Sequence, residues 1–143
     1  MKIKDVMSAD MEVLDSTATL EEAAQVMADA DVASVPVVRD GVPVGFITDR
    51  DIVVAGVAAG LAPGTTAVED VMTQDVVRCG ENADVEEAAG IMAAAQIRQL
   101  LVVDEEGELA GVVTLSDLAG KTEDASLNVP VHEAKAPGRT TPR

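Results

Sequence analysis

Gly45-Phe46-Ile47-Thr48-Asp49-Arg50-Asp51 and Gly111-Val112-Val113-Thr114-Leu115-Ser116-Asp117 are two versions of one pattern, Gly-x-apolar-Thr-x-x-Asp. In each, a short apolar run that favours a β-strand is followed by a threonine and, three residues later, by an aspartate. We expect a strand-to-helix junction at each position, where the hydroxyl and the carboxylate converge. The two stretches therefore predict a ligand site that is present twice.

The duplication extends beyond these stretches. Asp5-Val6-Met7-Ser8 recurs as Asp70-Val71-Met72-Thr73, and Leu20-Glu21-Glu22-Ala23-Ala24 recurs as Val85-Glu86-Glu87-Ala88-Ala89. Repeats of this kind usually pack against one another and share a core. We divide the chain into a first repeat at 1–60, a connector at 61–66, a second repeat at 67–120 and a C-terminal tail at 121–143. The tail is expected to be mobile or to dock on a partner.

Local signals in the first repeat predict the order β-α-β-β-α. A capping box of Thr19 and Glu22 predicts a helix that ends near Asp31. The β-branched stretch at 32–38 contains Pro36, so we expect the strand to open after the proline or to lie at a sheet edge. The remaining elements are a hairpin turn at 39–43, a strand at 44–48 and a helix at 49–59 that is closed by Gly60.

The second repeat follows the same order. Its expected elements are a strand at 76–77, a helix capped by Asp84 with Glu87, strands at 100–103 and 109–114, and a helix from Leu115. The fold class is therefore α/β, built from two tandem β-α-β-β-α repeats.

Composition excludes several classes of function. The chain has 143 residues and 48% hydrophobic residues, enough to form a core. An aromatic share of 1% and a net charge of −16 argue against nucleic-acid binding, which depends on base stacking and on clustered Lys and Arg. No apolar run is long enough to span a membrane, and we expect a cytoplasmic protein. With Cys79 and His132 as the only residues of their types, neither a zinc site nor a Ser/His/Asp or Cys/His catalytic set is expected, so the chain is not predicted to be an enzyme.

The doubled β-α-β-β-α order, with Gly-x-apolar-Thr-x-x-Asp at the end of each repeat, resembles the tandem cystathionine-β-synthase (CBS) domain pair. The resemblance covers residues 1 to about 120 and includes the opening Asp-Val-Met-Ser/Thr and the segment 97–104. It is strongest to small stand-alone actinobacterial members. It implies that the repeats pack with pseudo-twofold symmetry, that the chain forms a homodimer through its helices, and that an adenosine nucleotide is the ligand.

The resemblance also implies a role for each motif residue. Asp51 and Asp117 would accept hydrogen bonds from ribose hydroxyls, and Thr48 and Thr114 would meet phosphate. One cleft would combine Thr114 and Asp117 with Ser8, Met11, Ala33, Ser34 and Val35. The other would combine Thr48 and Asp51 with Thr73, Val76, Gln99 and Leu100.

Cations distinguish the two clefts. Family members often place a His or Arg just before the second strand of a repeat and a cation beside the motif of the other repeat. Arg98 and Arg50 fill these places, whereas their counterparts Ala33 and Ser116 are neutral. We therefore expect the Thr114/Asp117 cleft to bind phosphate better, and the Thr48/Asp51 cleft to be weak or empty.

Each assignment has a structural alternative. Thr48 and Thr114 are equally explained as helix N-caps, and Asp51 and Asp117 as first-turn acids that complement a helix dipole. The two arginines are also explained as partners of the acidic surface. Met residues 7, 27, 72 and 92 are expected in the core, and Cys79, which replaces Leu14, is expected to be a half-buried packing residue.

Two functions remain in view. The first is a regulatory module that senses AMP, ADP, ATP or NAD(H) in a cleft between the repeats, requires no cofactor and passes its signal to an unknown effector protein. The alternative is a structural or interaction dimer with vestigial pockets that docks on a partner. For either, the helical faces around Ala23, Met27, Ala88 and Met92 are expected to form the dimer contact.

Overall fold

The first long helix, α1 (Leu20–Ala30), begins at the capping box expected for it. The Thr19 hydroxyl accepts a hydrogen bond from the Glu22 N–H at 3.1 Å, and the Glu22 carboxylate accepts one from the Thr19 N–H at 2.8 Å. The helix ends at Asp31, which adopts the left-handed conformation with a φ of 59°. The prediction of this helix is confirmed at both ends.

The computed structural model describes residues 1–121 and divides the chain into two compact units. One unit is Glu12–Val76, and the other combines Met1–Met11 with the chain from Val77 onward. The segment that opens each sequence repeat therefore belongs to the unit built around the other repeat. Beyond Lys121, the predicted tail, including His132, lies outside the described residues.

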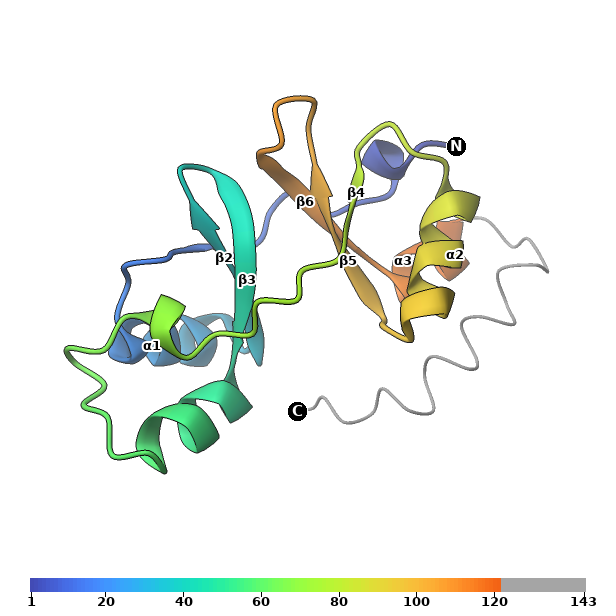
Figure 1. Ribbon diagram of the computed structural model, residues 1–143. Coiled ribbons are helices and arrows are strands. Elements are labelled where there is room, and N and C mark those ends of the chain that lie inside the picture. The colour runs from blue at the N-terminus through green and yellow to red at the C-terminus, as the bar shows by residue number, and fades with distance from the viewer. Residues whose placement is uncertain (122–143) are drawn as a thin grey trace. The chain divides into compact units, whose positions relative to one another are not determined.

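Both units have the predicted element order, with two strands after a short first strand and a helical segment at the end (Figure 1). The Glu12–Val76 unit consists of β1 (Leu14–Asp15), α1, β2 (Ser34–Arg39), β3 (Val42–Thr48), the π-helical η2 (Asp51–Val57) and the 3₁₀ turn η3 (Val68–Asp70). The other unit consists of the 3₁₀ turn η1 (Ile3–Asp5), β4 (Arg78–Gly80), α2 (Val85–Ala95), β5 (Gln99–Val103), β6 (Leu109–Thr114) and α3 (Leu115–Lys121).

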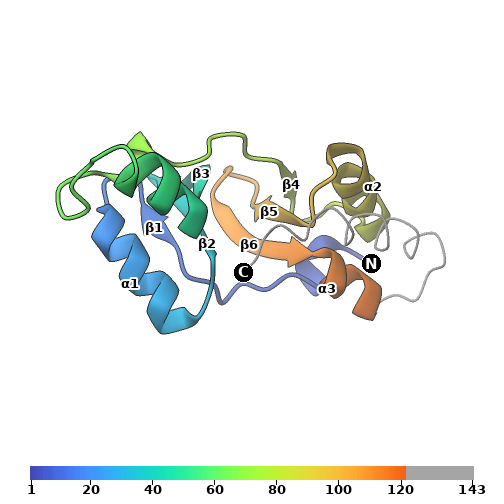
Figure 2. The same cartoon turned by 90° about the horizontal axis from the view of Figure 1, so that it is seen from below.

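Each unit has one three-stranded sheet, in the order β1-β2-β3 or β4-β5-β6. In both sheets the first pair of strands is parallel and the second pair is antiparallel. Figure 2 shows α2 and α3 beside the sheet of their unit, where they pack against one another. None of the helices in residues 1–121 is long and apolar enough to cross a lipid bilayer.

Both hairpins form where the turn residues predict them. Asp40 and Gly41, with φ of 55° and 83°, join β2 to β3, and two positive φ values are typical of a type I′ turn. In the other hairpin, the Asp104 carboxylate accepts hydrogen bonds from the N–H groups of Glu106 and Glu108 at 2.9 and 3.0 Å. Gly107, with a φ of 84°, completes that turn.

Pro36 lies inside β2, which is the central strand of its sheet. The prediction that this strand opens after the proline or lies at an edge is therefore wrong. Phe46, opposite Pro36, directs both backbone hydrogen bonds to Thr73 on the far side of β3. The nitrogen of Pro36 consequently points away from β3. The nitrogen therefore faces β1, which pairs only with Val37 and Val38. Because Pro36 precedes the first of these paired residues, its lack of an N–H costs no hydrogen bond to β1.

The first strand of the second repeat is β4, at Arg78–Gly80, and the prediction of a strand at 76–77 is wrong. In β4, Cys79 lies opposite Val102, the place that Leu14 holds opposite Val37 in β1. Both side chains are 7% exposed, so Cys79 is a packing residue as expected but is buried rather than half-buried. Burial raises the pKa of the Cys79 thiol, and the nearby Glu87 carboxylate raises it further.

Asp84 occupies the N-cap position of α2, but its side chain accepts no hydrogen bond from the helix. The predicted side-chain cap by Asp84 with Glu87 is therefore wrong. The first N–H of the helix, that of Val85, donates to the C=O of Met1 at 3.1 Å, and Lys2 forms an antiparallel bridge with Asp84. The N-terminal segment thus satisfies one of the N–H groups that the first turn of a helix leaves without an intrahelical partner.

Each unit has its own aliphatic core. Met27 and Met92 are buried in these cores, and Met7 and Met72 pack against them, which confirms the prediction for the four methionines. The predicted dimer contact is wrong, because its four residues are at most 8% exposed and face the sheets of their own units: Ala23, Met27, Ala88 and Met92.

The helix predicted at 49–59 forms, but with wider turns than expected. The N–H of Ala58 donates to the C=O of Val53 at 2.8 Å, a bond to the fifth preceding residue that is typical of a π-helix. Gly60, with a φ of 80°, closes this segment as predicted. Val53, Val54 and Val57 remain 58%, 50% and 59% exposed, so η2 presents an apolar surface.

Candidate functional site

The hydroxyl and carboxylate of each motif converge as the spacing predicts. At the end of β3, the Thr48 N–H donates to Asp51 Oδ2 at 3.0 Å, and the Asp51 N–H donates to Thr48 Oγ1 at 3.0 Å. At the end of β6, the Thr114 N–H donates to Asp117 Oδ2 at 2.9 Å, and the Asp117 N–H donates to Thr114 Oγ1 at 3.1 Å. These reciprocal bonds have the form of a capping box, so the capping role expected as the structural alternative is present in both units.

Capping does not use the full hydrogen-bonding capacity of either aspartate. An ionised carboxylate has two oxygens and about four acceptor positions. Both carboxylates are partly exposed and hold one of these oxygens against a threonine N–H. The cap restrains the position of each carboxylate and does not use its other oxygen. Each junction therefore presents an acceptor beside the motif threonine.

A second segment lies beside each junction. Thr73 forms an isolated antiparallel bridge with Phe46, with both backbone hydrogen bonds at 2.9 Å. Ser8 forms the corresponding bridge with Val112, again with two bonds of 2.9 Å. Each unit thus adds a residue of the other sequence repeat to its sheet, next to its own Thr-x-x-Asp motif.

Glycines permit this close approach. A Cβ added at Gly45 would lie 2.5 Å from the Thr73 carbonyl oxygen, and one added at Gly111 would lie 2.8 Å from the Ser8 carbonyl oxygen. Real Cβ atoms essentially never approach so closely. The glycine of the Gly-x-apolar-Thr-x-x-Asp pattern is therefore required by the segment that crosses it.

The two junctions differ in the side chain that the crossing segment brings. The Thr73 hydroxyl lies 3.2 Å from Asp51 Oδ2 and 3.4 Å from Asp51 Oδ1, within hydrogen-bonding distance of both. In the part of the chain that the structure describes, no hydrogen bond joins the Ser8 hydroxyl to Asp117. Asp51 therefore carries a side-chain partner that Asp117 lacks within residues 1–121.

The two predicted cations take different places. Arg98 is half-buried and precedes β5, and its C=O accepts a hydrogen bond from the Leu115 N–H at 3.0 Å. This bond holds the Arg98 backbone directly beside the Thr114/Asp117 junction. Arg50 is exposed, lies between Thr48 and Asp51 in the chain, and has its backbone N–H bonded to the Asp49 carboxylate at 2.8 Å.

The other predicted residues are divided between the units. Met11 is half-buried in the unit that contains Thr114 and Asp117, and Val76 is half-buried in the unit that contains Thr48 and Asp51. The Glu12–Val76 unit also holds Ala33, Ser34 and Val35, and the other unit holds Gln99 and Leu100. The role of these residues in a ligand site stays a prediction.

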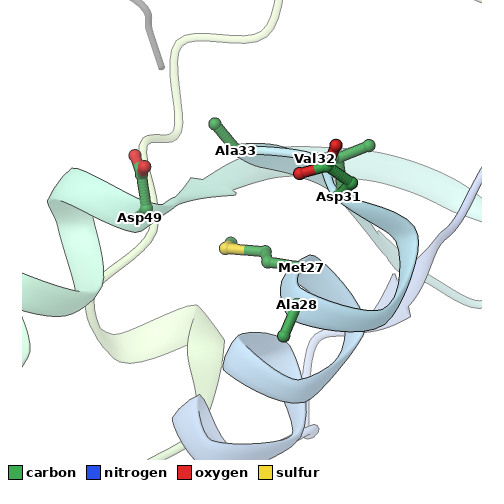
Figure 3. Close-up of a pocket in the computed structure, with 6 residues that line it drawn as sticks. All are labelled: Met27, Ala28, Asp31, Val32, Ala33 and Asp49. Carbon is green, nitrogen blue, oxygen red and sulfur yellow. The ribbon is translucent and has the colours of Figure 1, made fainter.

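A depression of about 440 Å³ lies beside Ala33 in the Glu12–Val76 unit (Figure 3). The Met27 side chain projects into it from α1, with Asp49 on one side and Asp31 and Val32 on the other. Ala28 completes the lining. The sequence does not indicate this depression, because its lining combines the end of α1, the residues before β2 and Asp49 after β3, which the fold brings together.

The charge around this depression opposes phosphate binding. Asp31, Ala33 and Asp49 correspond in the second repeat to Gln96, Arg98 and Leu115. The first repeat therefore has two carboxylates and no cation at these three positions, whereas the second repeat has one arginine and no acid. Because like charges repel, an anionic group is favoured beside Arg98 and disfavoured beside Asp31 and Asp49.

Comparison with known proteins places these features in a family. A family model described as the CBS domain matches residues 3–57 and 68–123. The chain is 39% identical over 117 residues to CBS domain-containing protein YhcV of Bacillus subtilis, with 82% of each chain covered. It is 34% identical over 117 residues to hypoxic response protein 1 of Mycobacterium tuberculosis, with 81% of each covered.

Solved structures agree with these matches. Hypoxic Response Protein I, crystallised with two coordinated zinc ions, has a TM-score of 0.75 and 32% identity over 85% of this chain and 99% of its own. The CBS domain pair of MJ0100, in complex with 5′-methylthioadenosine and S-adenosyl-L-methionine, has a TM-score of 0.67 and 28% identity over 84% of this chain and 94% of its own. Within residues 1–121 of the present chain, no group of three or more His, Cys, Asp or Glu side chains is placed to hold a metal ion.

Proposed function

The chain belongs to the CBS domain family, and from that premise we propose that it is a regulatory module that binds an adenosine nucleotide such as AMP, ADP, ATP or NAD(H) and performs no chemistry itself. The observation that carries the proposal is the pair of Thr-x-x-Asp junctions, each of which holds a carboxylate by a hydrogen bond from the motif threonine. A carboxylate with two acceptor oxygens suits the two adjacent hydroxyls of a ribose. The ligands of the MJ0100 domain pair, both of which contain a ribose, support the same class of ligand.

We place the stronger site at Thr114 and Asp117. The backbone of Arg98 is bonded beside this junction, and a guanidinium makes charge-assisted hydrogen bonds to phosphate. The Glu12–Val76 unit has Ala33 at the corresponding position and two carboxylates around the nearby depression. A phosphate-bearing ligand is therefore expected to occupy the Thr114/Asp117 site first.

Calorimetric titration of the full chain with AMP, ATP, NADH and S-adenosylmethionine tests the proposal. Asp117→Asn keeps an oxygen that can accept the Thr114 N–H bond but removes the charge, and Asp51→Asn is the matched control. We expect Asp117→Asn to weaken binding by about tenfold or more, because hydrogen bonds to a charged group contribute about 1.5–3 kcal/mol each. Asp51→Asn is expected to change the affinity much less.

Thermal unfolding without ligand provides the folding control for both variants. Equal losses in the two variants would contradict the assignment of the stronger site to Asp117. The absence of binding by the unmodified chain to all four compounds would contradict the nucleotide sensor itself.

Binding would act by linkage. A ligand favours whichever arrangement of the protein it contacts best, by no more than its differential affinity for the two arrangements. We propose that the chain acts in the cytoplasm, where these nucleotides are abundant, as a homodimer that passes the signal to an effector protein.

A second function, that of an interaction module with vestigial pockets, is favoured by the exposed valines of η2. Val53, Val54 and Val57 are all at least half exposed, and clustered apolar side chains of this kind often mark protein contacts. If this surface forms the homodimer, Val54→Asp with Val57→Asp shifts the sedimentation of the chain from dimer to monomer. If the double variant remains a dimer, the η2 surface is not the dimer contact.

A further inference from the structure

Asp51 and Asp117 have the same cap but different neighbours. In both, Oδ2 accepts the N–H of the motif threonine at 2.9–3.0 Å. Of the two, and among the residues that the structure describes, only Asp51 has its carboxylate within hydrogen-bonding distance of a hydroxyl from the crossing segment, that of Thr73. If these carboxylates bind ribose, as proposed above, the Thr73 hydroxyl competes with a ribose hydroxyl for the oxygens of Asp51.

The backbone holds Thr73 in this place. Its N–H and C=O are both bonded to Phe46 at 2.9 Å, and its carbonyl passes the bare Cα of Gly45. The side chain is therefore delivered to Asp51 by a fixed segment rather than by a free loop. A donor that is already in position competes with a ligand at little entropic cost.

Ser8 provides an internal comparison. It has the same place in the repeat, the same bridge, at Val112, and the same bond lengths of 2.9 Å. Its hydroxyl nevertheless forms no hydrogen bond with Asp117 within residues 1–121. A β-branched threonine has a restricted χ1 angle, whereas a serine rotates more freely, so the extra methyl group of Thr73 helps to hold its hydroxyl on Asp51.

We propose that Thr73 closes the Thr48/Asp51 site by acting as an internal substitute for a ribose hydroxyl, and that Ser8 leaves the Thr114/Asp117 site open. The inference rests on the proposed nucleotide function and extends it to the number of ligands. The chain binds one adenosine compound rather than two, and the residue after the Asp-Val-Met segment of each repeat decides which site is available.

Calorimetric titration with adenosine of the unmodified chain, Thr73→Ala and Ser8→Thr tests this inference, because adenosine carries no phosphate for Asp31 and Asp49 to repel. Thr73→Ala is expected to bind a second equivalent of adenosine, and the affinity of the Thr48/Asp51 site for adenosine is expected to be at least about tenfold higher than in the unmodified chain. Ser8→Thr is expected to lose several-fold in affinity, because a hydroxyl is then held beside Asp117. Both positions are exposed, so neither variant is expected to disturb a core.

The double variant Thr73→Ala with Asp51→Asn identifies the new site. It is expected to return to one equivalent, because the second ligand depends on the Asp51 carboxylate. A single equivalent in Thr73→Ala at adenosine concentrations ten times the dissociation constant of the unmodified chain overturns the inference, as does a second equivalent in the unmodified chain. No binding in any variant overturns the nucleotide function on which the inference rests.

Discussion

Gly45→Ala is predicted to destabilise the Glu12–Val76 unit through one backbone contact. The new Cβ would lie 2.5 Å from the Thr73 carbonyl oxygen and 2.9 Å from Met72 Sδ. Ordinary contact begins at 3.4 Å, so the Thr73 segment must retreat by about 1 Å. Methionine can adjust its side chain, but the carbonyl is held by the two bonds between Thr73 and Phe46.

The magnitude follows from what this retreat disrupts. The two bridge bonds of 2.9 Å contribute about 0.5–1.5 kcal/mol each. Alanine restricts the unfolded chain and returns about 0.4–1 kcal/mol. The free energy of unfolding is therefore expected to fall by about 1–2 kcal/mol, which corresponds to a decrease of several degrees in Tm.

Gly80→Ala is the matched control. Gly80 also lies in a short strand, its φ is not positive, and a Cβ added there meets nothing within 4 Å. Urea unfolding followed by circular dichroism is expected to show a change within about 0.5 kcal/mol for Gly80→Ala and the larger loss for Gly45→Ala. Equal midpoints for Gly45→Ala and the unmodified chain would refute the steric reasoning, and equal losses in both variants would show that the effect belongs to any glycine in a strand.

Three further outcomes are expected. Thr19→Ala should lower the free energy of unfolding by about 1 kcal/mol, because the α1 cap is lost. Asp84→Ala should have little effect, because the Asp84 side chain accepts no capping bond, and equal losses of the two variants in urea titrations would contradict the difference in capping. Cys79 should resist alkylation at neutral pH because it is buried, and rapid labelling of the folded protein would contradict this burial. The free energy of unfolding should also fall as the pH rises past the ordinary pKa of a thiol, because the unfolded chain then releases a proton that the folded chain retains. Arg98→Ala should weaken ATP binding more than adenosine binding, since the lost contact is to phosphate, and identical losses in calorimetry would place Arg98 away from the ligand.

Features set by neighbouring residues were predictable from the sequence. The capping box of Thr19 and Glu22 joins residues three positions apart, so its spacing specifies its geometry. The same holds for the Asp40-Gly41 turn and for the convergence of Thr48 with Asp51. In each case the interacting atoms belong to one turn of chain, and no distant segment is needed to bring them together.

The error at Pro36 has a different cause, which is a contact between segments far apart in the sequence. Pro36 is tolerated in a central strand because β1 is short and because Phe46 bonds to Thr73 instead. The length of β1 and the contact with Thr73 do not follow from the local pattern around Pro36. Nothing in the structure explains why the Asp84 side chain does not cap α2.

The candidate site shows both kinds of behaviour. The spacing of Thr114 and Asp117 predicts their reciprocal bonds, but no local pattern indicates that Thr73 reaches Asp51 whereas Ser8 makes no bond to Asp117. The repeat correspondence could have prompted the comparison, because it aligns a threonine with a serine. It could not show which hydroxyl bonds, since that depends on a side-chain rotamer beside a crossing segment.

The exchange of opening segments changes what a sequence repeat means in this protein. Ser8 belongs to the first repeat but bonds to Val112 beside Asp117, and Thr73 belongs to the second repeat but lies beside Asp51. Neither motif has its complete surroundings within its own repeat. A substitution in the Asp-Val-Met segment of one repeat therefore acts on the carboxylate of the other. The two repeats can therefore diverge in ligand preference without a change of the motif threonine and aspartate, which are the same in both, and the Thr73/Ser8 difference in the crossing segment is such a change.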